Sequence, residues 1–212
     1  MSIHKIKSLI KRIIEDPGDV LSYATGLFRG LCYLFYYNVF KSKVRVGFPF
    51  IADAKVRIIG PGTVTIGKGC RVMKNAFKGL TILTFSPDAV VTIGNKCLLG
   101  GTTIRCQGSV AIGDRTMTAI SLIQDRFFVH DGKRGLEARR RLPAEKKITM
   151  GRNVWLGEDS FVMSGSTIGD DCVVSSGSWC HDAVYQDYVL LMGSPIRSAI
   201  PIDKLLRLKG EL

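Results

Sequence analysis

Three histidines are the residues of this sequence best suited to acid–base chemistry, and they lie in different settings. His4 falls on a basic amphipathic segment, and His181 follows the last strict position of a repeat. His130 lies in the segment DRFFVHDGKRGLEARRRLPAEKK, residues 125–147. A neutral imidazole, with a pKa of about 6.5, can accept the proton of an attacking hydroxyl group at neutral pH. We predict that His130 is a general base; the alternative is an ordinary polar side chain of a loop.

A carboxylate near His130 would fix the tautomer of its ring. Asp125 and Asp131 are the candidates. Asp131 directly follows His130, which makes it hard for its carboxylate to reach the ring in a suitable orientation, so Asp125 is the first choice. The same segment carries a basic run made of Lys133, Arg134, Arg139, Arg140, Arg141, Lys146 and Lys147. Such a run is typical of a solvated basic face, and beside an active site it would also attract an anionic substrate.

The sequence on both sides of this segment repeats every six residues, and the structure formed by these repeats must position the segment. Every sixth residue from Met150 to Cys180 is apolar, and the residue four places after each is small or slender. The apolar set is Met150, Leu156, Val162, Ile168, Val174 and Cys180, and the small set is Val154, Ser160, Ser166, Cys172 and Ser178. The same unit recurs at Ile66, Ile93 and Ile112, so the period extends through much of the chain.

A hexad of this kind builds one face of a three-sided coil. The aliphatic residue points inward, where its burial contributes about 1.5–3 kcal/mol, and the small residue lies at a tight corner. Stacked coils pair their strands in parallel, which predicts an all-β solenoid. A β-sandwich, the alternative, would show a two-residue alternation with irregularly spaced turns. The segment 125–147 fits no hexad and must therefore loop out from a corner, where function is often carried.

The first 45 residues carry no hexad and are predicted to be helical. Residues 3–14 place apolar side chains at helical spacing with basic residues between them, and residues 16–18, Asp-Pro-Gly, end that helix. Residues 20–40 are apolar and long enough to span a bilayer, but Arg29 lies near their middle. We expect a helix that packs on the protein or lies in a membrane interface, with the basic residues within 41–45 facing anionic headgroups.

Composition limits the protein class further. A chain of 212 residues with 46% hydrophobic residues suits one domain plus an appendage. The net charge of +12 favours anionic partners such as phosphates, acidic glycans or anionic lipid, and no nucleic-acid-binding signature is present. None of the six cysteines lies in a CxxC pair, and Cys70, Cys97 and Cys172 occupy the small position of the six-residue period. We therefore predict small buried residues of a reducing compartment and not disulfides or metal ligands. We expect a cytoplasmic protein with peripheral contact at the inner face of the cell membrane.

The stretch ITMGRNVWLGEDSFVMSGSTIGDD and the exit MGSPIRSAI resemble the hexapeptide-repeat acyltransferases with a left-handed β-helix. This family includes maltose, galactoside and xenobiotic acetyltransferases and polysaccharide O-acetyltransferases. The resemblance covers about residues 60–200 and implies a left-handed parallel β-helix. We divide the chain into an N-terminal helical segment (1–45), a β-helix acyltransferase domain (46–200) with the extruded loop 125–147, and a C-terminal tail (201–212).

The resemblance also implies roles for single residues. The family places its catalytic histidine on such a loop, upstream of the tryptophan in an NVWIG motif, and His130 and Trp155 match these positions. Trp155 is therefore a substrate-binding candidate. Gly157 and Ser176 match coil corners along which coenzyme A lies, although the fold alone also requires small corner residues. Arg197 in GSPIR matches a basic residue that often meets the coenzyme A phosphates; a solvated exit loop is the equal alternative.

The chain departs from the small-sugar enzymes of the family. It reads His181-Asp182-Ala183 where members often have Thr-Lys-Asp, and QDRFFVHD is looser than the compact His-Pro segment of maltose-type enzymes. The acceptor is therefore not expected to be one of those small sugars. The resemblance as a whole implies an acetyl-CoA-dependent O-acetyltransferase acting on a sugar hydroxyl of a surface polysaccharide or its lipid-linked precursor. It also implies a homotrimer with the acyl site between subunits and no metal.

Other functions on the same fold stay open or are rejected. An N-acyltransferase acting on an amino-sugar nucleotide can use the same histidine, and a non-catalytic solenoid scaffold needs none. A γ-class carbonic anhydrase is rejected because its zinc usually has three histidine ligands, and only two histidines lie in the repeat region.

Overall fold

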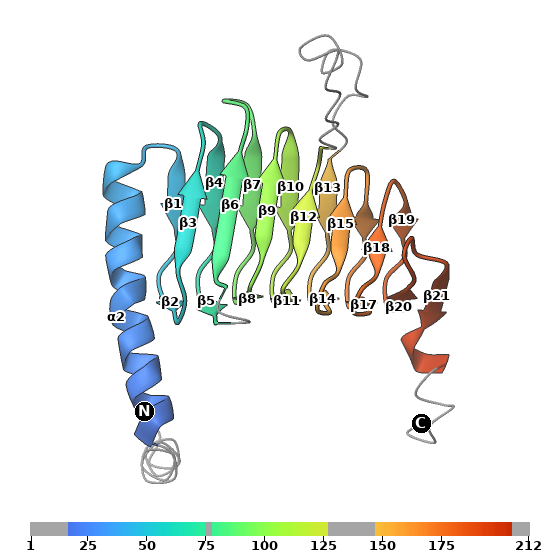
Figure 1. Cartoon of the computed structure of the whole chain (residues 1–212), viewed down its shortest axis with the longest axis horizontal. Helices are drawn as coiled ribbons and strands as arrows, with labels where there is room; N and C mark the ends of the chain where they lie inside the picture. The colour runs from blue at the N-terminus through green and yellow to red at the C-terminus, as the bar shows by residue number, and fades with distance from the viewer. Residues whose placement is uncertain (1–16, 75–77, 127–146, 205–212) are drawn as a thin grey trace.

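The chain winds into a three-sided solenoid of parallel β-strands with one helix against its N-terminal end (Figure 1). The computed structural model describes residues 17–74, 78–126 and 147–204, so the helix expected over residues 3–14 and the predicted base His130 lie outside the described residues. The predicted fold class, an all-β parallel β-helix with a helical N-terminal element, is confirmed.

Three sheets form the faces of the solenoid. Sheet A contains β1 (Val44–Val46), β4 (Thr63–Ile66), β7 (Val90–Ile93), β10 (Ser109–Ile112), β13 (Ile148–Met150), β16 (Thr167–Ile168) and β19 (Val184–Tyr185). Sheet B contains β2 (Phe50–Ala52), β5 (Cys70–Met73), β8 (Leu98–Gly100), β11 (Met117–Ala119), β14 (Trp155–Leu156), β17 (Val173–Val174), β20 (Val189–Met192) and β21 (Ser198–Pro201), the last being antiparallel to β20. Sheet C contains β3 (Val56–Ile59), β6 (Leu80–Thr84), β9 (Thr103–Cys106), β12 (Leu122–Gln124), β15 (Phe161–Met163) and β18 (Trp179–Cys180). The chain runs from sheet A to B to C in each coil, so we name the turns the A–B, B–C and C–A corners.

The hexad positions predicted from the sequence form the core. All six residues of the apolar set from Met150 to Cys180 are at most 2% exposed, and all five of the small set are likewise buried. In sheet A, Ile66 pairs with Ile93, which pairs with Ile112. Aliphatic side chains thus stack directly above one another along the axis, and their burial holds successive coils together.

The insertion after Gln124 leaves the stacking undisturbed. Strand β10 pairs in parallel with β13, and Ile112 lies opposite Met150 across the insertion. Strand β12 pairs with β15 in the same way, with Ile123 opposite Val162. The chain leaves sheet C after Gln124 and returns to sheet A at Ile148, so the insertion joins the solenoid at the C–A corner, at the upper edge in Figure 1.

Most cysteines lie where the sequence places them, with one exception. All six are free thiols, and Cys70, Cys97, Cys106, Cys172 and Cys180 are buried. Burial raises the pKa of the Cys180 thiol to about 12, which makes it unreactive at neutral pH. The prediction of burial is wrong for Cys32, which lies exposed on the helix because that helix packs by another face.

Helix α2 (Pro17–Phe40) packs on the first coil through a face that contains two glycines and Tyr37. Gly26 and Gly30 are buried, and a Cβ atom at Gly30 would collide with the carbonyl group of Phe50. Two glycines four residues apart thus let the helix axis approach strand β2 closely. Within the described ranges, no helix is both long enough and apolar enough to cross a membrane.

Side chains of the same helix form hydrogen bonds with backbone groups at the open edge of the first coil. The amide of Asn38 bonds both the N–H and the carbonyl of Val46, at 2.8 and 3.0 Å. The hydroxyl of Tyr37 accepts the Ile58 N–H at 3.1 Å and donates to the Val56 carbonyl at 3.3 Å. An end coil would otherwise present unpaired strand groups to other chains, so α2 acts as a cap of the solenoid.

Side chains at the A–B corner tie neighbouring coils together. An Asn or Asp in one coil accepts the backbone N–H of the coil before it. The contacts are Lys68 N to Asn95 Oδ1 at 2.9 Å, Asn95 N to Asp114 Oδ1 at 2.7 Å, Arg152 N to Asp170 Oδ1 at 2.7 Å, and Asp170 N to Asp187 Oδ1 at 2.8 Å. Bonds from the Asn95 backbone and side chain hold the pKa of Asp114 below its usual value, and the Arg152 guanidinium does the same for Asp170.

We predict that acid weakens the solenoid through these carboxylates. A depressed folded pKa means that their stabilisation is complete above the unfolded pKa of about 3.9 and disappears as pH falls through the lower folded pKa. Thermal unfolding followed from about pH 7 to about pH 2 should show Tm falling below about pH 4. The double variant Asp114→Asn/Asp170→Asn keeps both Oδ1 acceptors but cannot titrate, so it should lose less of its Tm between pH 5 and pH 2. Equal acid losses in the two proteins would contradict the assignment.

Candidate active site

The three predicted cofactor-binding residues lie at the B–C corner of three successive coils. Gly157 follows β14, Ser176 follows β17 and Arg197 follows β20. Backbone bonds stack these turns: Gly157 N donates to Val174 O at 2.8 Å, and Trp179 N donates to Gly193 O at 2.9 Å. The structure therefore brings Gly157, Ser176 and Arg197 to one edge of the prism.

Gly157 and Ser176 are direct neighbours across the coils. A Cβ atom on Gly157 would lie 2.6 Å from the backbone nitrogen of Ser176, so the fold itself requires glycine there. Gly177 differs, because a Cβ atom at that position would meet nothing within 4 Å and its φ of +68° is what favours glycine. The backbone beside Ser176 is therefore open at the surface, a feature that a ligand needs in order to approach the main chain.

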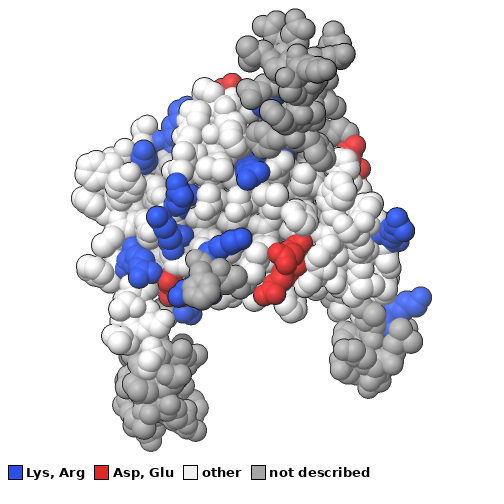
Figure 2. Space-filling view, viewed as in Figure 1, with Lys and Arg blue, Asp and Glu red and all other residues white. Residues whose placement is uncertain are grey.

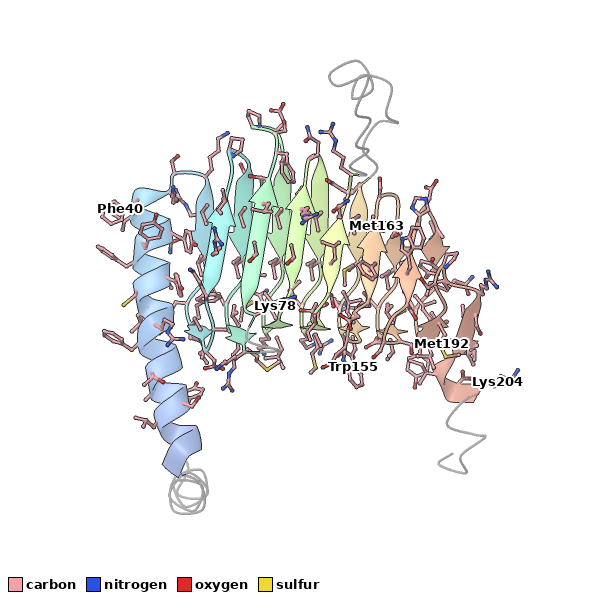
Figure 3. The ribbon with its side chains drawn as sticks, viewed as in Figure 1. Phe40, Lys78, Trp155, Met163, Met192 and Lys204 are labelled. Carbon is pink, nitrogen blue, oxygen red and sulfur yellow. The ribbon has the colours of Figure 1, made fainter. Side chains whose placement is uncertain are left out.

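Aromatic side chains flank this corner on both sides. Trp155 is 53% exposed on the outer side of sheet B, and Figure 3 shows it projecting from the edge of the solenoid. Phe161 is partly exposed on the outer side of sheet C, and it lies opposite Trp179 in the next coil. Within the described residues, the buried Nε1 of Trp179 finds no hydrogen-bond acceptor. The corner thus joins exposed aromatic surface to open backbone.

The first residues of the inserted segment, Asp125 and Arg126, lie at the C–A corner, and we call them the stem. Asp125 is fully buried, and its carboxylate accepts the N–H groups of Gln107 and Gly108 at 2.8 and 2.7 Å. Arg126 adds a bond from Nη1 to Gln107 Oε1 at 2.8 Å. Burial and the adjacent carboxylate raise the pKa of the Cys106 thiol, 3.4 Å from Asp125 Oδ2, to about 12. Asp125 therefore anchors the stem to the preceding coil, and its contact with His130 stays a prediction.

The stem and the corner lie at opposite edges of sheet C in one chain. Strand β12 ends at the stem, whereas β15 begins just after the turn that contains Gly157. Figure 1 shows these edges at the top and bottom of the face nearest the viewer. His181 is exposed at the C–A corner, where its ring stacks on Trp179 with centroids 5.8 Å apart. The residues that the structure describes contain no group of three or more His, Cys, Asp or Glu side chains placed to hold a metal ion.

Stacked three-sided coils of parallel strands define a parallel β-helix. Residues 90–116 and 147–179 match the family model described as the hexapeptide repeat of succinyl-transferase. The family resemblance predicted from the sequence is thereby confirmed at the level of the repeat. A search of curated proteins finds no significant match.

Solved structures share this fold at low sequence identity. One is a mutant of AntD, an N-acyltransferase from Bacillus cereus, in complex with dTDP and coenzyme A: it is 19% identical, the match covers 78% of this chain and 89% of that one, and the TM-score is 0.59. A second AntD mutant with the same ligands is 19% identical over 78% of this chain and 88% of that one, with a TM-score of 0.51. A maltose O-acetyltransferase from Clostridium difficile 630 is 18% identical over 77% and 72% of the two chains, with a TM-score of 0.46. The two AntD structures confirm the fold.

Proposed function

We propose that the chain is an acetyl-CoA-dependent O-acetyltransferase that acetylates a sugar hydroxyl of a surface polysaccharide or of its lipid-linked precursor. The observation that carries this proposal is the alignment of Gly157, Ser176 and Arg197 on successive coils of one corner, beside the exposed Trp155. Such a corner offers a long donor molecule close contact with the backbone and a cation at its end.

The described residues would hold the two substrates in distinct ways. The guanidinium of Arg197 is exposed and suits bidentate, charge-assisted bonds to the phosphates of coenzyme A. The open backbone beside Gly177 admits the slender part of the donor. Trp155 presents a flat apolar surface against which a sugar ring can pack.

His130 would supply the proton transfer. The acceptor oxygen bonds to the thioester carbonyl carbon while its proton passes to the neutral imidazole. Backbone N–H groups of the corner stabilise the negative charge that develops on the carbonyl oxygen. The carbon–sulfur bond then breaks, the acetyl group stays on the sugar oxygen, and the imidazolium returns the proton to the sulfur of coenzyme A. Asp125 would act as a positioning residue that holds the stem of the loop.

A homotrimer is the assembly that this site favours. We call the B–C corner that carries Gly157, Ser176 and Arg197 the donor corner. In one chain the stem and the donor corner lie at opposite edges of sheet C, so a loop from a second copy would complete the site. Sheet B also presents an apolar row in register along its outer side, made of Leu98, Met117, Trp155, Val173 and Leu190. A flat apolar row next to the corner is suited to association with another copy.

The proposal is tested by acetyl-CoA turnover against a panel of glycans and nucleotide-sugars. Release of coenzyme A that depends on a glycan hydroxyl supports O-acetylation. Turnover only with an amino-sugar nucleotide would favour the N-acyltransferase alternative, the reaction type named for the AntD structures. No turnover with any acceptor, together with full function in the cell after loss of His130, would favour a scaffold.

A membrane surface is the second partner of the proposed enzyme, at the cytoplasmic face. The side of α2 that faces away from the solenoid is apolar and exposed, with Leu21, Phe28, Phe35 and Val39 each more than half accessible. Lys41, Lys43 and Arg45 are exposed just beyond its end. Figure 2 shows that the Lys and Arg side chains of the visible face gather over its N-terminal half, next to α2. Apolar side chains bordered by cations fit a surface of anionic phospholipid.

We predict that Phe28→Ser/Phe35→Ser reduces binding to phosphatidylcholine vesicles containing phosphatidylglycerol by at least about tenfold, because two aromatic side chains no longer enter the interface. Co-sedimentation measures the bound fraction. Val184→Ser removes an apolar residue that is more exposed than either phenylalanine, on sheet A at the far end of the solenoid, and it should bind like the wild type. Wild-type protein that does not sediment with anionic vesicles would contradict the prediction.

A further inference from the structure

A long groove follows the A–B corner, at the edge of sheet B opposite to the donor corner. Its volume is about 930 Å³, and turns of five successive coils line it, from Phe48 at one end to Arg152 at the other. Since neighbouring strands lie about 4.8 Å apart, four coil-to-coil steps give a length of about 19 Å. Lys68, Lys96, Arg115 and Arg152 place one cation on each of four consecutive coils.

The backbone conformation at this corner does not favour long cationic side chains. One residue in each of six coils has a left-handed conformation, with φ between 55° and 74°: Gly69, Lys96, Arg115, Asn153, Asp171 and Tyr188. Gly, Asn and Asp tolerate this conformation, whereas long side chains are strained in it. The N–H of each residue makes the same bond to the coil before it, as Lys96 N does to Lys68 O and Arg115 N to Asn95 O, both at 2.8 Å. Tyr188 shows that this backbone accepts a large side chain outside the groove, so Lys96 and Arg115 are tolerated here but are not favoured by the local conformation.

The cations of the groove are available to a ligand. Lys68, Lys96 and Arg115 are exposed, and within the described residues their side chains make no hydrogen bond and no ion pair. Arg152, the fourth cation, is already paired with Asp170 at 2.6 Å, so the other three cations are the ones available to a ligand. The carboxylate of Asp114 is turned to the Asn95 N–H and amide, at 2.7 and 3.2 Å. A row of exposed positive charge, about 4.8 Å per step, matches a ligand whose negative charges also recur along a line.

We propose that this groove binds a linear acidic polysaccharide along the solenoid axis. The inference rests on the proposed function in that the polymer is the acceptor, held on the protein while one of its hydroxyls is acetylated. A compact phosphate would need cations that converge on one point, and these are spread over several coils. Single-stranded nucleic acid would need successive aromatic platforms, and Phe48 is the one aromatic residue among those lining the groove in the described structure.

Fluorescence anisotropy with labelled polygalacturonate, in the absence of acetyl-CoA, tests the groove. We expect binding that weakens with salt and no binding of neutral dextran. Lys96→Asn/Arg115→Asn should weaken polygalacturonate binding about 3- to 30-fold. The same double variant should raise Tm by about 2–6 °C, because asparagine relieves the backbone strain at both positions. Loss of affinity therefore cannot be attributed to unfolding.

The matched control is Lys55→Gln/Arg57→Gln, which removes two exposed charges near sheet C and leaves the groove intact. It should retain wild-type affinity. Equal losses in both double variants would overturn the proposal, since general surface charge would then explain binding. A single-stranded oligonucleotide that binds as tightly and depends on Lys96 and Arg115 in the same way would also overturn it. Binding without any acetyl transfer would count against the proposed function alone, and transfer to glycans without polygalacturonate binding would count against the groove alone.

Discussion

Replacing His130 by alanine is expected to lower kcat for acetyl transfer by about 10²- to 10⁴-fold, the range of a positioned general base. Without the imidazole, the proton of the acceptor hydroxyl has no acceptor as the carbon–oxygen bond forms. Steady-state release of coenzyme A measures the loss. In the wild type, kcat/KM should fall as pH drops below about 6.5, because a protonated imidazole cannot take up the proton. This fall should be absent from the residual activity of the variant.

His181→Ala is the matched control for this variant. It removes an imidazole that is exposed at the C–A corner and stacked on Trp179, outside the proposed chemistry. The control should keep its kcat within about twofold of the wild type, a change well below that from loss of a general base. If His181→Ala were inactive and His130→Ala active, the assignment of the base would be wrong.

Mixing two inactive variants tests whether the site is shared between subunits. His130→Ala chains carry an intact donor corner, and Arg197→Glu chains carry an intact loop. If each site combines the loop of one chain with the corner of another, reassembled mixtures contain some complete sites and recover activity. A site contained within one chain gives no recovery at any mixing ratio.

The hexad pattern predicts the solenoid because few residue types fit the inward positions of a coil. Leu156 and Ser160 have no exposed surface, and each is enclosed by the same position in the coils on either side, so residue type follows position closely. The donor corner follows from the same regularity. Gly157, Ser176 and Arg197 are separated by about three hexads each, which returns the chain to the same corner.

The first coil, β1 to β3, is not covered by the family resemblance, although its inner positions continue the period. Val46, Ala52 and Ile58 lie six residues apart and pair with Ile66, Val72 and Ile82. The small positions are occupied by larger residues, including Phe50, because α2 covers this end and the packing demands differ. A search of the sequence for apolar residues six apart, without requiring small residues at the corners, would find this coil.

Other features are not predictable from residue types alone. The left-handed positions at Lys96 and Arg115 carry no Gly or Asn signal, since stacking on neighbouring coils fixes that backbone conformation. The burial of Gly26 and Gly30 against the first coil depends on which face the helix presents. That choice leaves Cys32 and the apolar residues of the opposite side exposed, because only one face of a helix can contact a single solenoid end.

Replacing Asp125 by alanine is expected to destabilise the protein by about 3 kcal/mol, because two backbone N–H groups lose a charged acceptor. For a chain of this size, that corresponds to a fall in Tm of roughly 6–12 °C, measurable by circular dichroism or calorimetry. Asp125→Asn keeps one acceptor oxygen but turns an amide donor toward the second N–H, so it should also lose Tm. Asp131→Ala removes the other carboxylate considered for His130 and should leave Tm within about 2 °C of the wild type.

The activity of the same variants separates anchoring of the stem from direct contact with the base. If Asp125 acts through the stem, kcat falls with stability and the pH at which kcat/KM declines stays where it is in the wild type. If its carboxylate also bonds the His130 ring, loss of the charge lowers the imidazole pKa and moves that decline to lower pH. The geometry of the described residues favours the first result, because both carboxylate oxygens accept N–H groups of the Gln107–Gly108 turn. A Tm unchanged in Asp125→Ala would contradict the anchoring role, whatever the pH profile shows.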